Sequence, residues 1–203
     1  MRAEGQSEAP GIVAGVDEVG RGALFGPVVA AAVVLDARAT QELAAFGVTD
    51  SKRLSASRRQ ALVPVIQAQA GAYAVGWASV REIDRLNILQ ASLLAMRRAI
   101  RRLSPPPDLC LVDGNQPIPG LDIAQQTVIK GDQSQVAIAA ASIVAKVWRD
   151  TLIVRLDRRY PGYDLASNKG YGSPRHRAAI WQLGRSPQHR KSFRVGQQLT
   201  LLA

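Results

Sequence analysis

The sequence predicts an α/β fold, a mixed five-stranded sheet flanked by helices, with a small helical region toward the C-terminal end. Two observations carry this prediction. Short apolar runs of strand length alternate with longer segments in which apolar residues recur every three or four positions, as in amphipathic helices. In addition, 47% of the 203 residues are hydrophobic and 21% are charged. This composition is ordinary for a globular chain and argues against disorder over its whole length.

Five segments, most of them apolar runs, have the length of strands and are expected to form the sheet. They lie at residues 11–16, 27–35, 72–79, 109–112 and 123–129. The first two follow each other directly, whereas helical segments separate most of the others. This order predicts a mixed sheet rather than a purely parallel one.

Four helices are expected, at residues 54–70, 80–103, 133–159 and 174–183. Ser55 is suited to cap the first helix, and Pro64 within it predicts a kink or a second start. The second helix is expected to be continuous up to the prolines at 105–107. A glycine-rich loop at 168–173 precedes the last helix.

Charge is unevenly distributed along the chain. Lys and Arg number 26 against 16 Asp and Glu, a formal net charge of +10. Acids outnumber bases in the first 50 residues, whereas residues 51–100 and 151–203 are strongly basic. A basic surface around an acidic site is suited to a nucleic acid whose cleavage point is held by metal ions. A generally basic surface with no such partner is the alternative.

Composition also excludes several classes of protein. The one cysteine, Cys110, excludes a disulfide framework and a multi-cysteine zinc site, and it is typical of a reducing compartment. The longest apolar stretch, residues 22–35, is interrupted by Pro27 and is shorter than the ~20 residues of a spanning helix. The N-terminus lacks the pattern of a signal peptide. We therefore expect a cytoplasmic protein with no membrane segment.

Three acids stand where predicted strands stop. Asp17 and Glu18 follow the first strand, and Asp113 follows the fourth. Carboxylates that share a cleft need an offsetting charge, and Mg²⁺ or Mn²⁺ prefer oxygen ligands. As neighbours, Asp17 and Glu18 can share a site only if the strand ends or bends there, near Gly20 and Gly22. The alternative is that all three are solvated acids at strand ends.

Two residues compete to be a fourth carboxylate. Asp132 precedes a predicted helix, where an N-cap is its ordinary role. Asp150 lies within the long helix four residues after Lys146, where an intrahelical ion pair is expected.

The segment GVDEVGRG at 15–22 only approximates two nucleotide-binding motifs. It lacks the Lys-Ser/Thr of a P-loop, and Phe25 occupies the position of the third glycine of a dinucleotide fingerprint. What remains is a glycine loop with accessible main-chain N–H groups and one guanidinium, that of Arg21. Such a loop allows a sugar-phosphate backbone to approach closely.

Seven segments, taken together and in order, resemble the ribonuclease HII family. They are DEVGRG at 17–22, DSKRL at 50–54, LNIL at 86–89, VDGN at 112–115, KGD at 130–132, AASIVAKVWRD at 140–150 and KGY at 169–171. The resemblance covers roughly residues 11–195, which would form the catalytic domain between a flexible tail at 1–10 and a C-terminal tail at 196–203.

The resemblance implies a ribonuclease H-like fold and a metal-dependent endonuclease. Members of the family hydrolyse the RNA strand of RNA–DNA hybrids and cut 5′ to ribonucleotides embedded in duplex DNA. They use Mn²⁺ or Mg²⁺ in a two-metal hydrolysis that leaves a 3′-hydroxyl and a 5′-phosphate, with a role in ribonucleotide removal, DNA repair and replication. A monomer is implied as well.

By position, the resemblance also implies site residues. The metal-binding and catalytic carboxylates would be Asp17, Glu18, Asp113 and Asp132, with Asp132 favoured over Asp150. The substrate-binding residues would be Gly20, Arg21, Gly22, Ser51, Lys52 and Tyr171.

Each substrate-binding residue would have its own task. Gly20, Arg21 and Gly22 would sense the 2′-hydroxyl through main-chain groups, and Tyr171 would pack on the sugar. Ser51 and Lys52 would hold a phosphate, with a solvated loop as the alternative. For Tyr171 the alternative is a core residue that anchors its loop.

The basic part at about 155–195 is expected to bind the duplex backbone without reading sequence. Each of its arginines, taken alone, is expected to be a solvated charge. His176 and His189, the only histidines, are expected to contact phosphate or to lie on the surface.

The C-terminal QLTLL at 198–202 resembles the short peptide by which bacterial repair proteins dock on the DNA sliding clamp, with Leu202 in place of the final aromatic residue. Packing of Gln198–Leu202 on the domain itself is the alternative. Two other functions remain open: a resolvase or exonuclease of the same broad fold, and a non-catalytic hybrid-binding protein.

Overall fold

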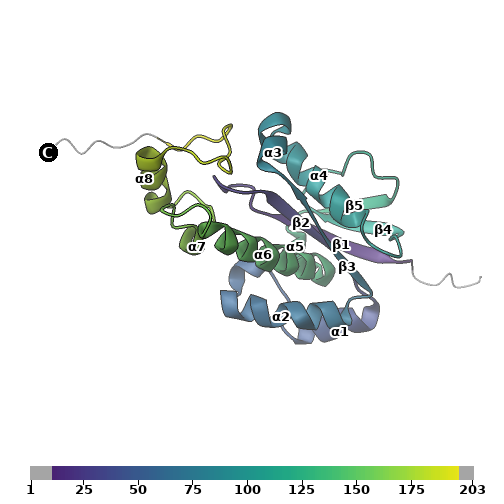
Figure 1. Ribbon diagram of the computed structural model, residues 1–203. Helices are drawn as coiled ribbons and strands as arrows, with labels where there is room; N and C mark the ends of the chain where they lie inside the picture. The colour runs from purple at the N-terminus through teal and green to yellow at the C-terminus, as the bar shows by residue number, and fades with distance from the viewer. Residues whose placement is uncertain (1–10, 197–203) are drawn as a thin grey trace, which may run out of the picture.

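The computed structural model describes residues 11–196. The tails predicted at 1–10 and at 196–203, including the segment 198–202, lie outside this range except for Gly196. Five strands form one mixed sheet in the order β3-β2-β1-β4-β5 (Figure 1). Their bounds are β1 Val13–Val19, β2 Val28–Val34, β3 Ala72–Ala78, β4 Leu109–Asp113 and β5 Ala124–Val128. The predicted mixed five-stranded sheet is confirmed.

Strand direction changes at the middle of the sheet. The strands β1, β2 and β3 are antiparallel neighbours, whereas β4 runs parallel to β1 and to β5. The helices are α1 Ala37–Ala45, α2 Ala56–Gln69, α3 Val80–Leu86, α4 Ile88–Ile100, α5 Gly131–Ser134, α6 Val136–Asp157, α7 Leu165–Asn168 and α8 Pro174–Leu183. A short 3₁₀ helix, η1, spans Ser51–Arg53.

Helices cover both faces of the sheet, as Figure 1 shows. On β2, Val28 and Ala30 pack in the core that contains α4, while Val29 and Ala31 pack in the core that contains α1, α2 and α6. This alternation is the period of two expected along a strand buried on both faces. The apolar run that contains β2 is therefore continuous rather than alternating.

Small residues bring α6 and α4 unusually close to the sheet. A Cβ built on Gly15 of β1 would lie 2.2 Å from the backbone of Ala137 on α6. A Cβ on Gly76 of β3 would lie 2.3 Å from the carbonyl oxygen of Ala95 on α4. Helix α6 is therefore pressed against β1, next to the predicted carboxylates.

The helices differ from the prediction at several places, and the short α7 was not predicted. Asn87, with a φ of 72°, divides the predicted helix at 80–103 into α3 and α4, and its side chain caps α4. The predicted helix at 133–159 is preceded by the separate turn α5 and starts after Gln135. Helix α1 was not predicted; Asp36 caps it by accepting a hydrogen bond from the amide of Ala39. No second helix starts at Pro64, which lies inside the continuous α2.

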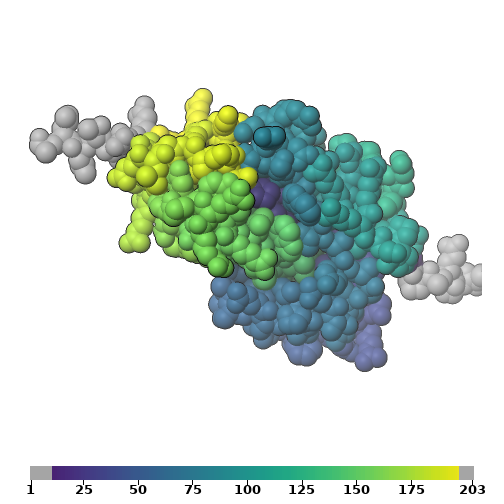
Figure 2. Space-filling model, in the orientation of Figure 1, coloured from purple at the N-terminus to yellow at the C-terminus, as the bar shows by residue number. Residues whose placement is uncertain are grey.

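The C-terminal part forms a third core with the β1–β2 connection. Leu24 and Phe25 of that connection pack with Ile153 of α6, Leu165 of α7 and Ile180 of α8. Figure 2 shows the green and yellow C-terminal part on one side of a hollow whose floor is formed by purple atoms from early in the chain. Among the described residues, no helix has the length and apolar composition needed to cross a bilayer.

Candidate active site

A pocket of about 430 Å³ lies where β1 and β4 end. Three of the four predicted carboxylates line it, together with the glycine loop and all of the other predicted substrate-binding residues. The lining residues are Asp17, Glu18, Val19, Gly20, Arg21, Gly22, Ser51, Lys52, Asp113, Ser142, Lys146 and Tyr171. Sequence positions more than 150 residues apart therefore meet in one polar cavity.

Asp17 and Glu18 reach this pocket from inside a strand. The expected end or bend at this point is wrong, because β1 continues to Val19 and stays in register with β2. The parallel pairing with β4 stops at Val16 and Val112. The next residues, Asp17 and Asp113, therefore lie on neighbouring strands just beyond the point where this pairing ends. The backbone amide of Glu18 donates to Oδ1 of Asp17 over 2.6 Å.

Asp113 and Asp132 are held together by the turn that follows β5. Oδ1 of Asp113 accepts a hydrogen bond of 2.7 Å from the amide of Gly131. Lys130 has a left-handed backbone, with φ of 55°, and starts the short helix α5 that carries Asp132. Asp132 is buried, and its Oδ2 lies 3.4 Å from Nζ of Lys52. Lys52 thus links Asp132 to the pocket.

The pocket disfavours negative charge on its own acids. Burial raises the pKa of Asp17 well above its ordinary value, and the nearby charge of Glu18 adds to the rise. Burial raises the pKa of Glu18 as well, against the opposing effect of Arg21, whose Nη1 lies 3.3 Å from Oε1 of Glu18. Burial also raises the pKa of Asp113. These carboxylates lack a cation strong enough to offset their proximity.

The donor set fits a divalent metal chemically. All four side chains offer carboxylate oxygens, the ligands that Mg²⁺ and Mn²⁺ prefer. In residues 11–196, no three or more His, Cys, Asp or Glu side chains already stand close enough together to hold one ion. Coordination of one ion by three or more of these side chains would thus require them to move closer together.

The glycine loop forms one wall of the pocket. Gly20 has a φ of 89°, which favours glycine, and a Cβ there would lie 2.1 Å from Nε of the buried Arg149. A Cβ at Gly22 would meet no atom within 4 Å. The backbone conformation and the close approach of Arg149 therefore require glycine at position 20. At position 22, by contrast, the space that a side chain would occupy is open.

Ser51 and Lys52 occupy η1 and differ in exposure. Ser51 is buried, and its Oγ lies 2.8 Å from Oγ of Ser142 on α6. The side chain of Lys52 is 83% exposed. Asp50 fixes the turn by accepting a hydrogen bond from the amide of Lys52 over 2.9 Å. The alternative of a solvated loop is thus wrong for Ser51.

Tyr171 lines the pocket from the turn that follows α7. Its ring is half-buried, with Nζ of Lys146 and Cζ of Arg149 each 5.5 Å from the ring centroid. The amides of Leu24 and Phe25 both donate to the carbonyl of the preceding Gly170, which joins this turn to the glycine loop.

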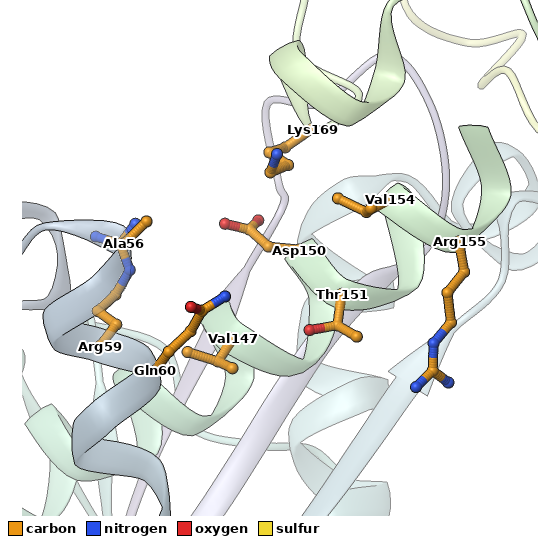
Figure 3. A pocket seen from close by; sticks show the side chains of 9 residues that line it. All are labelled: Ala56, Arg59, Gln60, Val147, Asp150, Thr151, Val154, Arg155 and Lys169. Carbon is orange, nitrogen blue, oxygen red and sulfur yellow. The ribbon is translucent and has the colours of Figure 1, made fainter. Parts of the chain in front are cut away.

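Asp150 lies in a different cavity. This second pocket, between α2 and α6, is also lined by Arg59, Arg155 and Lys169 (Figure 3). Oδ1 of Asp150 accepts from Nζ of Lys146 over 3.0 Å, the intrahelical pair expected from the spacing. The geometry therefore supports Asp132, beside Asp113, as the fourth acid.

Comparison with known proteins decides the family. A sequence model of the family described as ribonuclease HII matches residues 14–195. The ribonuclease HII of Acaryochloris marina is 67% identical over 181 residues, which cover 89% of this chain and 91% of that protein. The chain belongs to the ribonuclease HII family.

Solved structures agree with this ribonuclease HII assignment. The ribonuclease H2 of Pyrococcus horikoshii superposes with a TM-score of 0.76 at 28% identity, over 91% of this chain and 94% of that one. A structure of the PCNA:RNase HII complex from Archaeoglobus fulgidus gives a TM-score of 0.77 at 28% identity, over 93% and 98%. The fold is thus ribonuclease H-like, and the protein is a metal-dependent endonuclease that hydrolyses RNA–DNA hybrids.

Two polar side chains that line this ribonuclease HII pocket, those of Ser142 and Lys146, were missed from the sequence. Ser142 contacts Ser51 and lines the pocket together with Asp17, and Lys146 stands near Tyr171. Both lie within the matched segment at 140–150, one helical turn apart. Their four-residue spacing, which places both side chains on one face of α6, was the signal in the sequence that could have identified them.

The histidines contradict the expectation of phosphate contact or surface exposure. His176 is fully buried and His189 is 2% exposed. Their Nε2 atoms lie 3.1 Å apart, and Nδ1 of His176 lies 2.8 Å from the carbonyl oxygen of Tyr171. They form a buried pair behind the turn that carries Tyr171.

Proposed function

We propose that this enzyme cuts the RNA strand of hybrids and also cuts 5′ to single ribonucleotides embedded in duplex DNA, leaving a 3′-hydroxyl and a 5′-phosphate. One observation carries the proposal. Asp17, Glu18 and Asp113 line the same pocket as the main chain of Gly20–Gly22. A site for phosphodiester hydrolysis therefore adjoins a loop close enough to read a sugar.

The proposed metal ligands are Asp17, Glu18, Asp113 and Asp132. Asp17 and Asp132 are buried and Glu18 and Asp113 are half-buried, and divalent cations, Mg²⁺ or Mn²⁺, would stabilise the ionised form of these carboxylates. A pair of such ions would supply an activated water and charge neutralisation at the departing 3′-oxygen. Lys52, beside Asp132 and largely exposed, is placed to receive a phosphate as substrate enters.

Selection of RNA rests on the 2′-hydroxyl, the group that distinguishes the two sugars. We assign its detection to the main chain of Gly20, Arg21 and Gly22, and sugar packing to Tyr171, both of which line the pocket. Ser51 would orient Lys52 from its buried position. The basic part at about 155–195 would bind the backbone of either strand.

Two other functions are less well supported. A DNA-only nuclease of the same fold needs no sensor of the 2′-hydroxyl, whereas this pocket has a main-chain wall beside its acids. A non-catalytic hybrid-binding protein would tolerate loss of Asp17 or Asp113, yet all four acids are present.

Mapping the product ends tests the proposal. A duplex with one ribonucleotide and a labelled strand is digested with Mn²⁺ or Mg²⁺, and the fragments are compared with synthetic markers. The expected downstream fragment begins with the ribonucleotide and carries a 5′-phosphate that ligase can join. A cut 3′ to the ribonucleotide, or a 2′,3′-cyclic end, would refute the assignment.

We also propose a role in ribonucleotide removal during repair and replication, in the cytoplasm, as a monomer. Docking of Gln198–Leu202 on the bacterial sliding clamp would bring the enzyme to its substrate. The Archaeoglobus protein was solved with PCNA, which supports a clamp as partner.

Calorimetry tests the docking of this segment. A Gln198→Ala/Leu201→Ala variant should bind the clamp more weakly than the full-length chain does. Equal binding, or none by the full-length chain at high micromolar concentration, would end this part of the proposal.

A further inference from the structure

A buried arginine from the C-terminal segment contacts the glycine loop from behind. Residues 185–193 follow α8 and lie beside the β1–β2 connection (Figure 1). The amide of Gly26 donates to the carbonyl of Gln188 over 2.9 Å, and the amide of Arg190 donates to the carbonyl of Leu24 over 2.9 Å. The side chain of Arg190 is thereby directed under the loop.

The side-chain hydrogen bonds of Arg190 in the described residues all go to main-chain carbonyls. It is 1% exposed, and no carboxylate of the described residues forms a salt bridge with it. Nη2 donates to Gly20 O over 2.7 Å, Nη1 to Arg21 O over 2.7 Å, and Nε to Gly26 O over 3.0 Å. A guanidinium offers these donors in a fixed planar fork, so it sets the directions of the carbonyls it binds.

The directions of the Gly20 and Arg21 carbonyls determine which main-chain groups of the glycine loop face the pocket. A trans peptide points its C=O and the following N–H in opposite directions, and the one cis peptide recorded in residues 11–196 is Ser104–Pro105. With the carbonyls of Gly20 and Arg21 turned inward to Arg190, the N–H groups of Arg21 and Gly22 point outward. No acceptor in the described residues takes up either N–H, and both residues line the pocket.

The segment that carries Arg190 is itself anchored. The carboxylate of Asp84, on α3, accepts hydrogen bonds from the amides of Lys191 and Ser192 over 3.0 and 2.9 Å. It also accepts one from Oγ of Ser192 over 2.6 Å. These bonds follow Arg190 immediately in the chain and hold its backbone in place.

We propose that Arg190 is a positioning residue for specificity: by binding the carbonyls of Gly20 and Arg21, it aims the N–H groups of Arg21 and Gly22 at the ribose 2′-oxygen. This inference rests on the proposed detection of the 2′-hydroxyl by the glycine loop. Arg190 itself touches no substrate. It lies some 170 positions along the chain from the loop whose donors it orients.

The test compares Arg190→Lys with Arg185→Lys. Arg185 belongs to the same segment and also binds carbonyls, those of Arg190, Lys191 and Phe193, but it does not touch the glycine loop. Affinity is measured by fluorescence anisotropy in chelator, so that nothing is cut, for an all-DNA duplex and for the same duplex with one ribonucleotide. Folding of each variant is checked by circular dichroism and thermal melting.

Wild type and Arg185→Lys should prefer the ribonucleotide duplex. Arg190→Lys should reduce this preference by about tenfold, the effect of losing one well-aligned hydrogen bond, with affinity for all-DNA unchanged. With metal added, kcat/KM on the ribonucleotide duplex should fall by a similar factor. A folded Arg190→Lys that keeps the preference, or that loses affinity for both duplexes equally, would overturn the inference.

A second variant covers the case in which Arg190→Lys does not fold. Asp84→Ala leaves the guanidinium in place but removes the anchor of the segment behind it. The preference for the ribonucleotide duplex should fall by a smaller factor, and an unchanged preference would count against the inference. A wild type with no preference at all would instead overturn the proposed 2′-hydroxyl sensing, and this inference with it.

Discussion

Asp17 occupies an environment that opposes its own charge. Its side chain is 5% exposed, Glu18 and Asp113 are nearby, and burial raises its pKa well above the ordinary value. Folding therefore stabilises the neutral form of Asp17 relative to the ionised one. Such an arrangement lowers the stability of the protein without metal and raises its affinity for a cation.

Replacing either central acid with its amide should separate binding from catalysis. Asp17→Asn or Asp113→Asn should reduce cleavage by at least about a hundredfold, because an oxygen ligand and its charge are lost. Duplex affinity should stay close to wild type, and the thermal midpoint without metal should not fall, since a disfavoured charge has gone. Turnover by both variants at wild-type rates would contradict the assigned metal site.

The two histidines should resist protonation more than free imidazoles do. Nδ1 of His189 accepts from the amide of Ser186 over 2.9 Å, so its proton lies on Nε2 and is donated to Nε2 of His176. His176 must then carry its proton on Nδ1 and donate to Tyr171 O. Burial lowers the pKa of His189 to about 4, with a further lowering by His176 and Arg185. Burial also lowers the pKa of His176, partly opposed by Asp164.

Ring ¹⁵N spectra of histidine-labelled protein test this directly, because the chain has only 2 histidines. His189 should remain neutral at pH 6, and His176 should titrate at a lower pH than a free imidazole, with the two rings in the different tautomers given above. In the unfolded chain the two histidines take up protons near pH 6.5, whereas in the folded protein their pKa values are lower. Protonation therefore favours the unfolded chain, and the contribution of this pair should lower the free energy of unfolding as the pH decreases from 6.5 toward 4. The raised pKa values of Asp17 and Glu18 act in the opposite direction. A ring that titrates near 6.5 would show that the pair is not buried as described.

At the scale of elements, the position of the site depends on how closely α6 approaches β1. Gly15 allows this approach, and the next turns of α6 carry Ser142 and Lys146 into the pocket. A larger residue at position 15 would push the helix outward.

Gly15→Ala should therefore lower both stability and activity. The added methyl would stand 2.2 Å from Ala137 C, and relief of such overpacking costs about 1–3 kcal/mol. Denaturant unfolding measures the loss. Gly71→Ala is the control, since its Cβ would meet Val34 at an ordinary 3.7 Å and should change stability by about 0.5 kcal/mol or less. Equal stabilities would mean that the two elements are not in such tight contact.

The sequence predicts these elements well where local patterns decide them. All five strands lie close to the predicted places, and in β1 to β4 the apolar runs that predict them are partly or fully buried, whereas β5 is mostly exposed. The break at Asn87 was missed because the apolar spacing continues through it, and only its φ of 72° separates α3 from α4. The continuation of β1 through Asp17 was missed because its pairing with β2 is a long-range contact that buries polar residues in a strand.

At the scale of the whole molecule, distant parts of the chain build one site. The motifs identify the carboxylates and the glycine loop, and their convergence in one pocket agrees with that prediction. Burial of His176, His189 and Arg190 was not predictable, since runs of basic residues are usually solvated. Their environment depends on the return of residues 185–193 to the β1–β2 connection, which no local pattern encodes.

Charge is also organised at this scale. The acids of the site come from the early and middle parts of the chain, whereas the basic residues concentrate in 51–100 and 151–203. A duplex attracted by the basic surface would present its backbone to a pocket that needs cations before it can accept a phosphate.

The central claim is that the metal-binding acids and the glycine loop act together, so that cutting needs both a divalent ion and a 2′-hydroxyl. A cleavage assay on three labelled duplexes tests it most directly: all-DNA, DNA with one ribonucleotide, and an RNA–DNA hybrid, each with Mg²⁺, with Mn²⁺ and with chelator. We expect metal-dependent cuts in the hybrid and 5′ to the lone ribonucleotide, with all-DNA intact. Cleavage of all-DNA, or cleavage in chelator, would contradict it.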